Sequence, residues 1–183
     1  MSAPRLEQLA EIETAVWAEL CAAVRDKAHP WRLGVLATTD GHEADARTVV
    51  LRELDAATRT LIVYTDARSA KAQQAETHPR ATLVLWSEAL GWQLRLRVQL
   101  AVQTAGLTVS SRWAQLKMTP AAHDYLSPLP PGSTVEHPRP QRGSRTHFAV
   151  LEAEVQTVDW LELHAEGHRR AIFDAGGRRW VAP

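Results

Sequence analysis

The feature that most constrains the fold is a regular alternation of apolar and polar residues from 93 to 103. Every second side chain is leucine or valine, and glutamine or arginine fills most of the positions between them. The apolar set is Leu94, Leu96, Val98, Leu100 and Val102. Because successive side chains of a strand point to opposite faces, the pattern predicts a half-buried antiparallel strand with a polar face open to a ligand or partner.

Other segments rich in apolar and β-branched residues predict further strands, separated by turn signals such as Asp40-Gly41. These segments cover residues 33–38, 47–52, 61–65, 81–86, 148–163 and 169–173. With residues 93–103 they make the predicted fold class mainly β (α+β), a β-barrel with short peripheral helices.

Three segments have the periodicity or composition of helices. Residues 4–27 repeat apolar side chains at three- and four-residue spacing. Residues 66–77 are rich in alanine, glutamine and lysine and predict a short helix with Asp66 as its N-cap, and residues 107–126 predict a third.

The sequence contains no internal repeat and no clear domain boundary. We therefore expect one domain over residues 1–183, with an N-terminal helix within 1–30 and a barrel over 31–183. Residues 127–147 predict a proline-rich loop, because five of the ten prolines fall between Ser127 and Pro140. A solvated connection and a functional lid are both open interpretations of this loop.

Charge and composition limit the classes of partner. The 21 lysines and arginines equal the 21 aspartates and glutamates, so no net field attracts the chain to nucleic acid or to an anionic membrane. The single cysteine, Cys21, excludes an intramolecular disulfide. No run approaches the ~20 apolar residues of a membrane span, and no charged segment leads into an apolar stretch at the N-terminus. The cytoplasm is the expected location.

Common catalytic and nucleotide-binding signatures are absent from the sequence. It contains no G-x-G-x-x-G after a strand, no P-loop and no G-x-S-x-G elbow. His164 and His168 have a helical metal-ligand spacing, but they flank a predicted turn and no cysteine or carboxylate pattern completes a site. We therefore expect no metal.

The stretch from Arg47 to Lys71 carries residues suited to an anion. They are Arg47, Arg52, Tyr64, Thr65, Arg68, Ser69 and Lys71. The last three fall at the first turn of the predicted helix, where free N–H groups and a positive potential add to the cationic side chains. That combination suits a phosphate monoester. It equally suits surface cations on a solvated helix end, and the spacing alone leaves both interpretations open.

The order of several motifs resembles the FMN-binding half of pyridoxamine 5'-phosphate oxidases, and more closely their shorter Alr-type branch. The motifs are RTVVLR at 47–52, YTDARSAK at 64–71, HPRA at 78–81 and WQLR at 92–95. The resemblance runs from about residue 31 to 102 and resumes in VDWLEL at 158–163 and HRR at 168–170.

The resemblance implies a homodimer of split barrels with two FMN sites at the subunit interface. The cofactor-binding residues it implies are Arg47, Thr48, Val49, Val50, Arg52, Tyr64, Thr65, Arg68, Ser69, Lys71, Gln93, Trp160 and Arg170. The residues that would hold the phosphate and ribityl chain are Arg47, Arg52, Arg68, Ser69 and Lys71. Tyr64 and Thr65 would contact the flavin. Gln93 would approach the isoalloxazine from the partner subunit, Trp160 would lie beside the ring, and Arg170 would stand near its polar edge.

The family's substrate motif departs from the pattern in this sequence. The motif is Arg-x-His before the late arginine, and aligning it on His168 and Arg170 places Glu166 at the arginine position. The family's Tyr-x-x-x-Arg corresponds here at best to Trp113 and Lys117. A carboxylate in place of the arginine reverses the local charge and would repel a phosphate, which speaks against oxidation of vitamin B6 phosphates.

Several functions remain open. The leading hypothesis is an FMN-dependent oxidoreductase that transfers a hydride from an unidentified small substrate to the flavin, with His168 as the candidate general base. A second is a flavin-binding protein without turnover, and a third is a barrel that binds haem or a deazaflavin.

Overall fold

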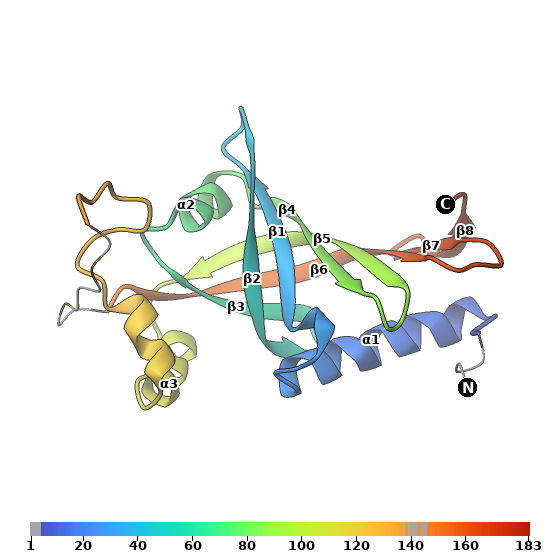
Figure 1. Cartoon of the computed structure of the whole chain (residues 1–183), viewed down its shortest axis with the longest axis horizontal. Coiled ribbons are helices and arrows are strands. Elements are labelled where there is room, and N and C mark those ends of the chain that lie inside the picture. Colours follow the sequence, from blue (N-terminus) through green and yellow to red (C-terminus); the bar gives the residue numbers. More distant parts are fainter. Residues whose placement is uncertain (1–4, 138, 140–142, 144–145) are drawn as a thin grey trace.

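The computed structural model describes residues 5–137, 139, 143 and 146–183. Its centre is a closed six-stranded antiparallel barrel (Figure 1). The strands are β1 (Leu33–Thr39), β2 (Ala44–Asp55), β3 (Thr60–Asp66), β4 (Arg80–Ser87), β5 (Trp92–Gln103) and β6 (Phe148–Glu162). They neighbour one another in the order β3-β2-β1-β4-β5-β6, and the pairing of β3 with β6 closes the ring.

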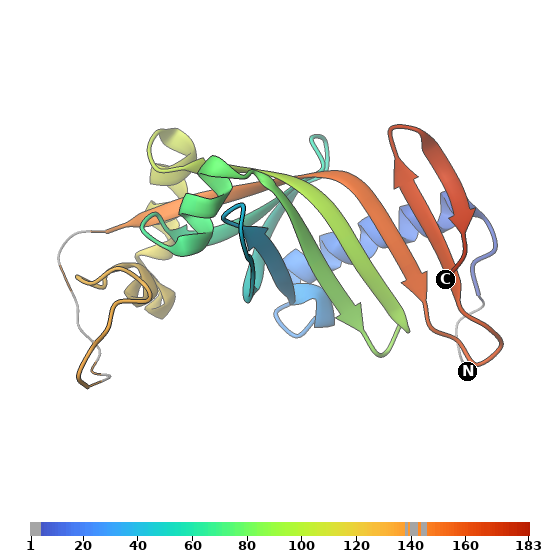
Figure 2. The ribbon, with the colours of Figure 1, turned by 90° about the horizontal axis from the view of Figure 1, so that it is seen from above.

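Strand β6 belongs to two parts of the sheet. Its first half pairs with β3, its second half pairs with β7 (Arg169–Asp174), and β5 runs beside nearly all of it. The hairpin of β7 and β8 (Gly177–Val181) therefore extends the sheet beyond the barrel (Figure 2). Sharing one strand makes the hairpin and the barrel a continuous surface.

Helix α1 (Leu9–Arg25) lies along the barrel and reaches the β7–β8 hairpin (Figures 1 and 2). A short 3-10 helix (Pro30–Arg32) then leads into β1, and Nη1 of Arg32 donates to the carbonyl oxygen of Val24 at 2.7 Å. A cation at this end complements the unpaired carbonyls and the helix dipole. The helix predicted over 4–27 is present but shorter, because it begins at Leu9 and ends at Arg25, and the described residues 5–8 before it are not helical.

Two helix predictions need correction. Helix α2 (Ala70–Thr77) is capped by Ser69 rather than by Asp66, because residues 66–69 form a turn in which Ser69 N–H bonds the carbonyl of Asp66. The predicted helix over 107–126 divides into α3 (Leu107–Leu116) and a 3-10 helix (Pro120–Tyr125). Proline disfavours helical geometry in the residue before it and lacks the N–H that a continuous helix needs.

Two hydrophobic clusters hold the fold together. The larger joins the buried face of α1 to the interior side chains of the barrel and includes Trp31, Trp92 and Trp160. The smaller lies under α3 and includes Tyr125, Phe148 and Val150. Each strand with one buried face thus follows the alternation visible in its sequence.

The prediction of a mainly β barrel with peripheral helices is confirmed. All seven predicted strands are present, and β8 is an additional strand that the sequence did not reveal. Of the proline-rich loop, residues 138, 140–142, 144 and 145 lie outside the described part. Among the described residues, no helix is both long enough and apolar enough to span a membrane.

Candidate functional site

A polar cluster at the start of α2 brings together three of the predicted phosphate-binding residues, Arg47, Ser69 and Lys71, with Thr65, which was predicted to contact the flavin. Nζ of Lys71 donates to Oγ1 of Thr65 at 3.2 Å, and this oxygen lies 3.0 Å from Oγ of Ser69. Both hydroxyl residues are buried. Arg47 reaches the same helix from β2, where Nη2 donates to Oε1 of Gln74 at 3.3 Å.

Lys71 is a half-buried cation at the centre of this cluster. The carboxylates whose charges act on it, Asp66 and Asp45, are paired with Arg68 and Arg47. Within the part of the chain that the structure describes, Lys71 forms no ion pair of its own. Burial lowers the pKa of Lys71 from its ordinary value, and the positive charge of Arg47 lowers it further. A nearby anion would favour the ammonium form and so oppose this lowering of the pKa.

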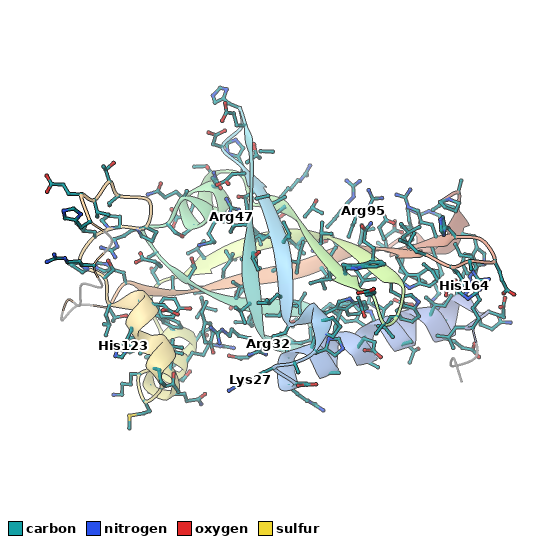
Figure 3. All side chains as sticks on the ribbon, in the orientation of Figure 1. Lys27, Arg32, Arg47, Arg95, His123 and His164 are labelled. Atoms are coloured by element: carbon teal, nitrogen blue, oxygen red, sulfur yellow. The ribbon has the colours of Figure 1, made fainter. Side chains whose placement is uncertain are left out.

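Arg47 is held in place by neighbours from three elements. Nη1 donates to the hydroxyl of Thr38 and, at 3.2 Å, to the carbonyl oxygen of Leu36 on β1. Nη2 bonds Asp45 on its own strand and Gln74 on α2. Figure 3 shows Arg47 beside α2. Its guanidinium is thus oriented before any ligand arrives, which lowers the entropic cost of binding.

Arg68 is directed to the proline-rich loop. Nε and Nη2 donate to the two carboxylate oxygens of Asp66 at 3.0 and 2.7 Å. The guanidinium also donates to the backbone carbonyls of Ser127 at 2.9 Å, Pro128 at 3.2 Å and Leu129 at 3.3 Å. Arg68 therefore ties the start of this loop to the turn before α2.

Replacing Arg68 with alanine is expected to release the loop over residues 127–137. The three carbonyls lose their donor, so the segment should open more often and be cleaved several-fold faster. Limited proteolysis with subtilisin, mapped by mass spectrometry, measures the rate. Arg25→Ala, at an exposed position on α1, is the control, and equal cleavage of the two variants would contradict the role of Arg68.

Arg52 has different neighbours from Arg47. The pairing of β2 with β3 shifts between Leu51 and Glu53, which makes Arg52 the extra residue of a β-bulge. Its guanidinium carbon lies 5.5 Å from the ring centroid of Tyr64, whose hydroxyl donates to Glu53 at 2.7 Å. Burial and then this hydrogen bond raise the pKa of Tyr64. Nε of Arg52 is buried and finds no hydrogen-bond partner among the described residues.

Four residues that the resemblance assigns to the flavin lie on the outer face of the sheet: Thr48, Val50, Gln93 and Arg170. Strand pairing places Thr48 opposite Val35 and Val50 opposite Leu33. Gln93 pairs with Trp86 on one side and with Leu161 on the other, and Leu161 in turn pairs with Arg170. Gln93 and Arg170 are therefore one strand apart on the same face.

Val49 and Trp160 point to the covered face. Val49 is buried in the barrel, and Trp160 is fully buried with its ring 5.5 Å from that of Trp92 and 6.3 Å from that of Trp180. Trp160 pairs with Leu94, the residue after Gln93. Because neighbouring residues of a strand point to opposite faces, one protomer cannot present both Gln93 and Trp160 to the same side of a ligand.

The candidate base His168 lies in the loop between β6 and β7. Its Nδ1 accepts a hydrogen bond from the backbone N–H of His164 at 3.2 Å, and Glu166 in the same loop is exposed. Figure 3 shows His164 at the β7–β8 end of the molecule, away from Arg47. Among the described residues, no three histidine, cysteine or acidic side chains gather as metal ligands.

Sequence reasoning missed two groups of contacts around the predicted residues. Thr38 and Gln74 orient Arg47, and Asp159 binds both Arg95 and Arg170. Asp159 could have been noticed as an acidic residue between the apolar Val158 and Trp160, but its partners lie on other strands. Contacts between strands depend on register, which no local pattern shows.

Comparison with known proteins reveals similarity to one family. Residues 6–104 match the family model described as pyridoxamine 5'-phosphate oxidase, FMN-binding domain. The chain is also 27% identical over 150 residues to the pyridoxine/pyridoxamine 5'-phosphate oxidase of Caulobacter vibrioides. The matched region covers 75% of this chain and 67% of that protein.

Solved structures share the fold. A pyridoxamine 5'-phosphate oxidase-related, FMN-binding protein from Nostoc punctiforme PCC 73102 superimposes with a TM-score of 0.72 at 23% identity, over 92% of this chain and 96% of that one. PhzG from Burkholderia lata 383 superimposes with a TM-score of 0.76 at 15% identity, over the full length of both chains. These similarities confirm the split-barrel architecture.

Proposed function

Because the chain belongs to the family of the pyridoxamine 5'-phosphate oxidase FMN-binding domain, we propose that it binds FMN and acts as an oxidoreductase on a small substrate. When bound, FMN supplies the redox chemistry by accepting a hydride at N5 and passing the electrons to oxygen or another acceptor. The protein supplies the binding groups and their orientation.

The observation that carries the proposal is the half-buried ammonium of Lys71, which forms no ion pair with any carboxylate of the described residues. It stands beside Arg47 and two buried hydroxyls, those of Thr65 and Ser69, at the start of α2. Two cations, two hydroxyls and the free N–H groups of a helix terminus form a donor set that fits a phosphate monoester. The donor chemistry therefore fits the phosphate of FMN.

The remaining residues divide into two groups around this phosphate site. Arg52, whose Nε has no hydrogen-bond partner in the described part of the chain, offers a donor from the bulge of β2 beside Tyr64. Gln93 and Arg170 offer an amide and a guanidinium from the outer face of the sheet. We propose that the first group binds FMN within one protomer and that the second meets the flavin held by the partner.

We further propose a homodimer formed through the outer face of the barrel. Three large apolar side chains are exposed there: Leu33 at 54%, Val35 at 42% and Trp86 at 44%. Strand pairing aligns them on adjacent strands beside Gln93. Contiguous exposed apolar side chains on a sheet face are typical of an interaction surface, and this surface adjoins the proposed flavin contacts.

Replacing Trp86 with glutamate is expected to raise the dissociation constant of the dimer at least about 100-fold, because a charge without a partner would be buried in the interface. Sedimentation velocity over a concentration series measures it. Leu107→Glu on α3, at a side chain that is 87% exposed, is the control. An unchanged dissociation constant in Trp86→Glu would show that the dimer interface does not include this face of the barrel.

The substrate is proposed to differ from the vitamin B6 phosphates named for the curated relatives. Glu166, at the position of the family's substrate arginine, is exposed in the β6–β7 loop with a carboxylate oxygen 3.9 Å from Nδ1 of His164. A carboxylate there disfavours a phosphate group.

An absorbance spectrum of the purified protein tests the cofactor. Flavin bands, together with FMN released by heat and identified by chromatography, are the expected result. A haem or deazaflavin spectrum would show that the barrel binds that cofactor instead of FMN. A colourless protein that takes up no added FMN would overturn the proposal.

Steady-state peroxide release on a panel of amines, alcohols and nicotinamide donors tests turnover. Hydride transfer predicts bleaching of the flavin bands by at least one donor without oxygen. Bound FMN that no donor reduces would favour a flavin-binding protein without turnover.

A further inference from the structure

The carboxylate of Asp159 binds two arginines at once on the outer face of the sheet. Nε and Nη2 of Arg170 donate to its two oxygens at 2.9 and 2.8 Å, and Nη2 of Arg95 donates to Oδ2. Asp159 is on the central strand β6, with Arg95 on β5 and Arg170 on β7. We call these three residues the Asp159 triad.

The triad carries one positive charge that it does not neutralise. The side chain of Asp159 is only 9% exposed, whereas that of Arg95 is 43% exposed and that of Arg170 is 27% exposed. Burial alone would raise the pKa of Asp159, but the hydrogen bonds from Arg170 and Arg95 outweigh it and lower that pKa. Asp159 is therefore ionised at neutral pH, and two guanidiniums share a single carboxylate.

Among the described residues, Arg95 keeps more free donors than Arg170. Arg170 uses Nε and one terminal nitrogen on Asp159, whereas Arg95 uses one terminal nitrogen and is the more exposed of the two. A guanidinium with free donors and a fixed plane matches a carboxylate in a bidentate pair. The single residual charge matches a monoanion better than the dianion of a phosphate.

The triad lies beside the residue proposed to face the flavin. Arg95 is two positions after Gln93 and on the same face of β5, and Arg170 is one strand away from Gln93 across Leu161. Figure 3 shows Arg95 on the sheet between α2 and the β7–β8 hairpin. A small molecule that meets a flavin near Gln93 is therefore within the field of Arg95.

We propose that the substrate carries a carboxylate and that Arg95 binds it; this inference rests on the proposed function. Asp159 is the positioning residue that orients Arg95 and Arg170. In this arrangement the Asp159 triad selects monoanionic substrates over neutral and dianionic ones.

Benzoate is the probe for this site, with benzyl alcohol as its neutral analogue and phenyl phosphate as its dianionic analogue. Binding to the protein as purified is followed by tryptophan fluorescence, because exposed Trp86 pairs with Gln93 beside the triad. Any flavin bands are recorded in the same titration. Benzoate is expected to bind at least tenfold more tightly than benzyl alcohol.

Arg95→Ala is expected to weaken benzoate binding at least tenfold, and Arg95→Gln should weaken it similarly if alanine impairs folding. Arg97→Ala is the matched control, because Arg97 is an exposed arginine two positions along the same face of the same strand. It should change benzoate binding less than twofold. Asp159→Asn should raise the affinity for phenyl phosphate relative to benzoate, since it removes the one negative charge of the triad and leaves both guanidiniums uncompensated.

Equal losses in Arg95→Ala and Arg97→Ala would overturn the inference in favour of a general positive potential, as would equal binding of benzoate and benzyl alcohol. The fluorescence titration does not require flavin. If the protein contains no FMN and benzoate binding is weakened in Arg95→Ala but not in Arg97→Ala, the carboxylate site is supported and the flavin function is contradicted. If the protein contains flavin but Arg95→Ala leaves the affinity for benzoate unchanged, the flavin function is supported and the carboxylate site is contradicted.

Discussion

Replacing Lys71 with methionine is expected to weaken FMN binding by about 1.5–3 kcal/mol, equivalent to roughly a 10- to 160-fold increase in Kd. Methionine keeps most of the length and apolar character of the lysine stem and removes only the ammonium. That ammonium donates to Thr65 and has no carboxylate of its own among the described residues, so its charge remains available to an anion. Titration of the apoprotein with FMN, followed by quenching of flavin fluorescence, measures the change.

Lys117→Met is the matched control, because Lys117 is exposed beyond the end of α3. It should leave FMN affinity unchanged. Equal affinities of wild type and Lys71→Met would show that the cluster at the start of α2 does not hold the phosphate.

The pH dependence of FMN binding provides a second measurement on the same pair of variants. In the protein without FMN, burial and then the charge of Arg47 lower the pKa of Lys71 below the ordinary lysine value of 10.5. Its ammonium is therefore lost at lower pH than that of an exposed lysine, and FMN affinity should fall as pH rises towards 10.5. Lys71→Met should lack this decline, whereas Lys117→Met should keep it.

Replacing Trp160 with alanine is expected to lower the free energy of unfolding by about 3–5 kcal/mol. The side chain is fully buried, packs edge-on against Trp92 and has the guanidinium of Arg169 5.8 Å from its ring centroid. It lies where the barrel continues into the β7–β8 hairpin, so the cavity would weaken both. Urea denaturation followed by circular dichroism measures the loss.

Trp160→Phe should cost less than Trp160→Ala, because it keeps a ring and removes an indole N–H that is buried without a partner among the described residues. Leu107→Ala, at an 87% exposed side chain, is the control and should change stability by less than about 0.5 kcal/mol. A loss of under 1 kcal/mol in Trp160→Ala would contradict the packing role. A loss of FMN affinity in Trp160→Phe at unchanged stability would support the flavin contact that the resemblance implies.

The main strands could be predicted because each signal is local. The alternation from Leu94 to Val102 and the turn at Asp40-Gly41 depend only on side-chain chemistry and on the geometry of a strand. Strand β8 was missed because Gly177–Val181 is short and mostly exposed, so it has no buried face to produce an alternation. Helix ends were harder to predict, since Asp66 and Ser69 are both good N-caps and the choice between them follows from the turn that Arg68 and the loop stabilise.

The sequence by itself determined the residue types of the candidate site and the order of the barrel strands along the chain. Only the tertiary structure decided their partners. It joined Lys71 to Thr65 and Ser69, turned Arg68 to the proline-rich loop, and placed Arg95 and Arg170 on either side of Asp159. The physical reason is that a charged side chain takes the partner with the best geometry and burial, and strand register brings that partner from residues far away in the sequence.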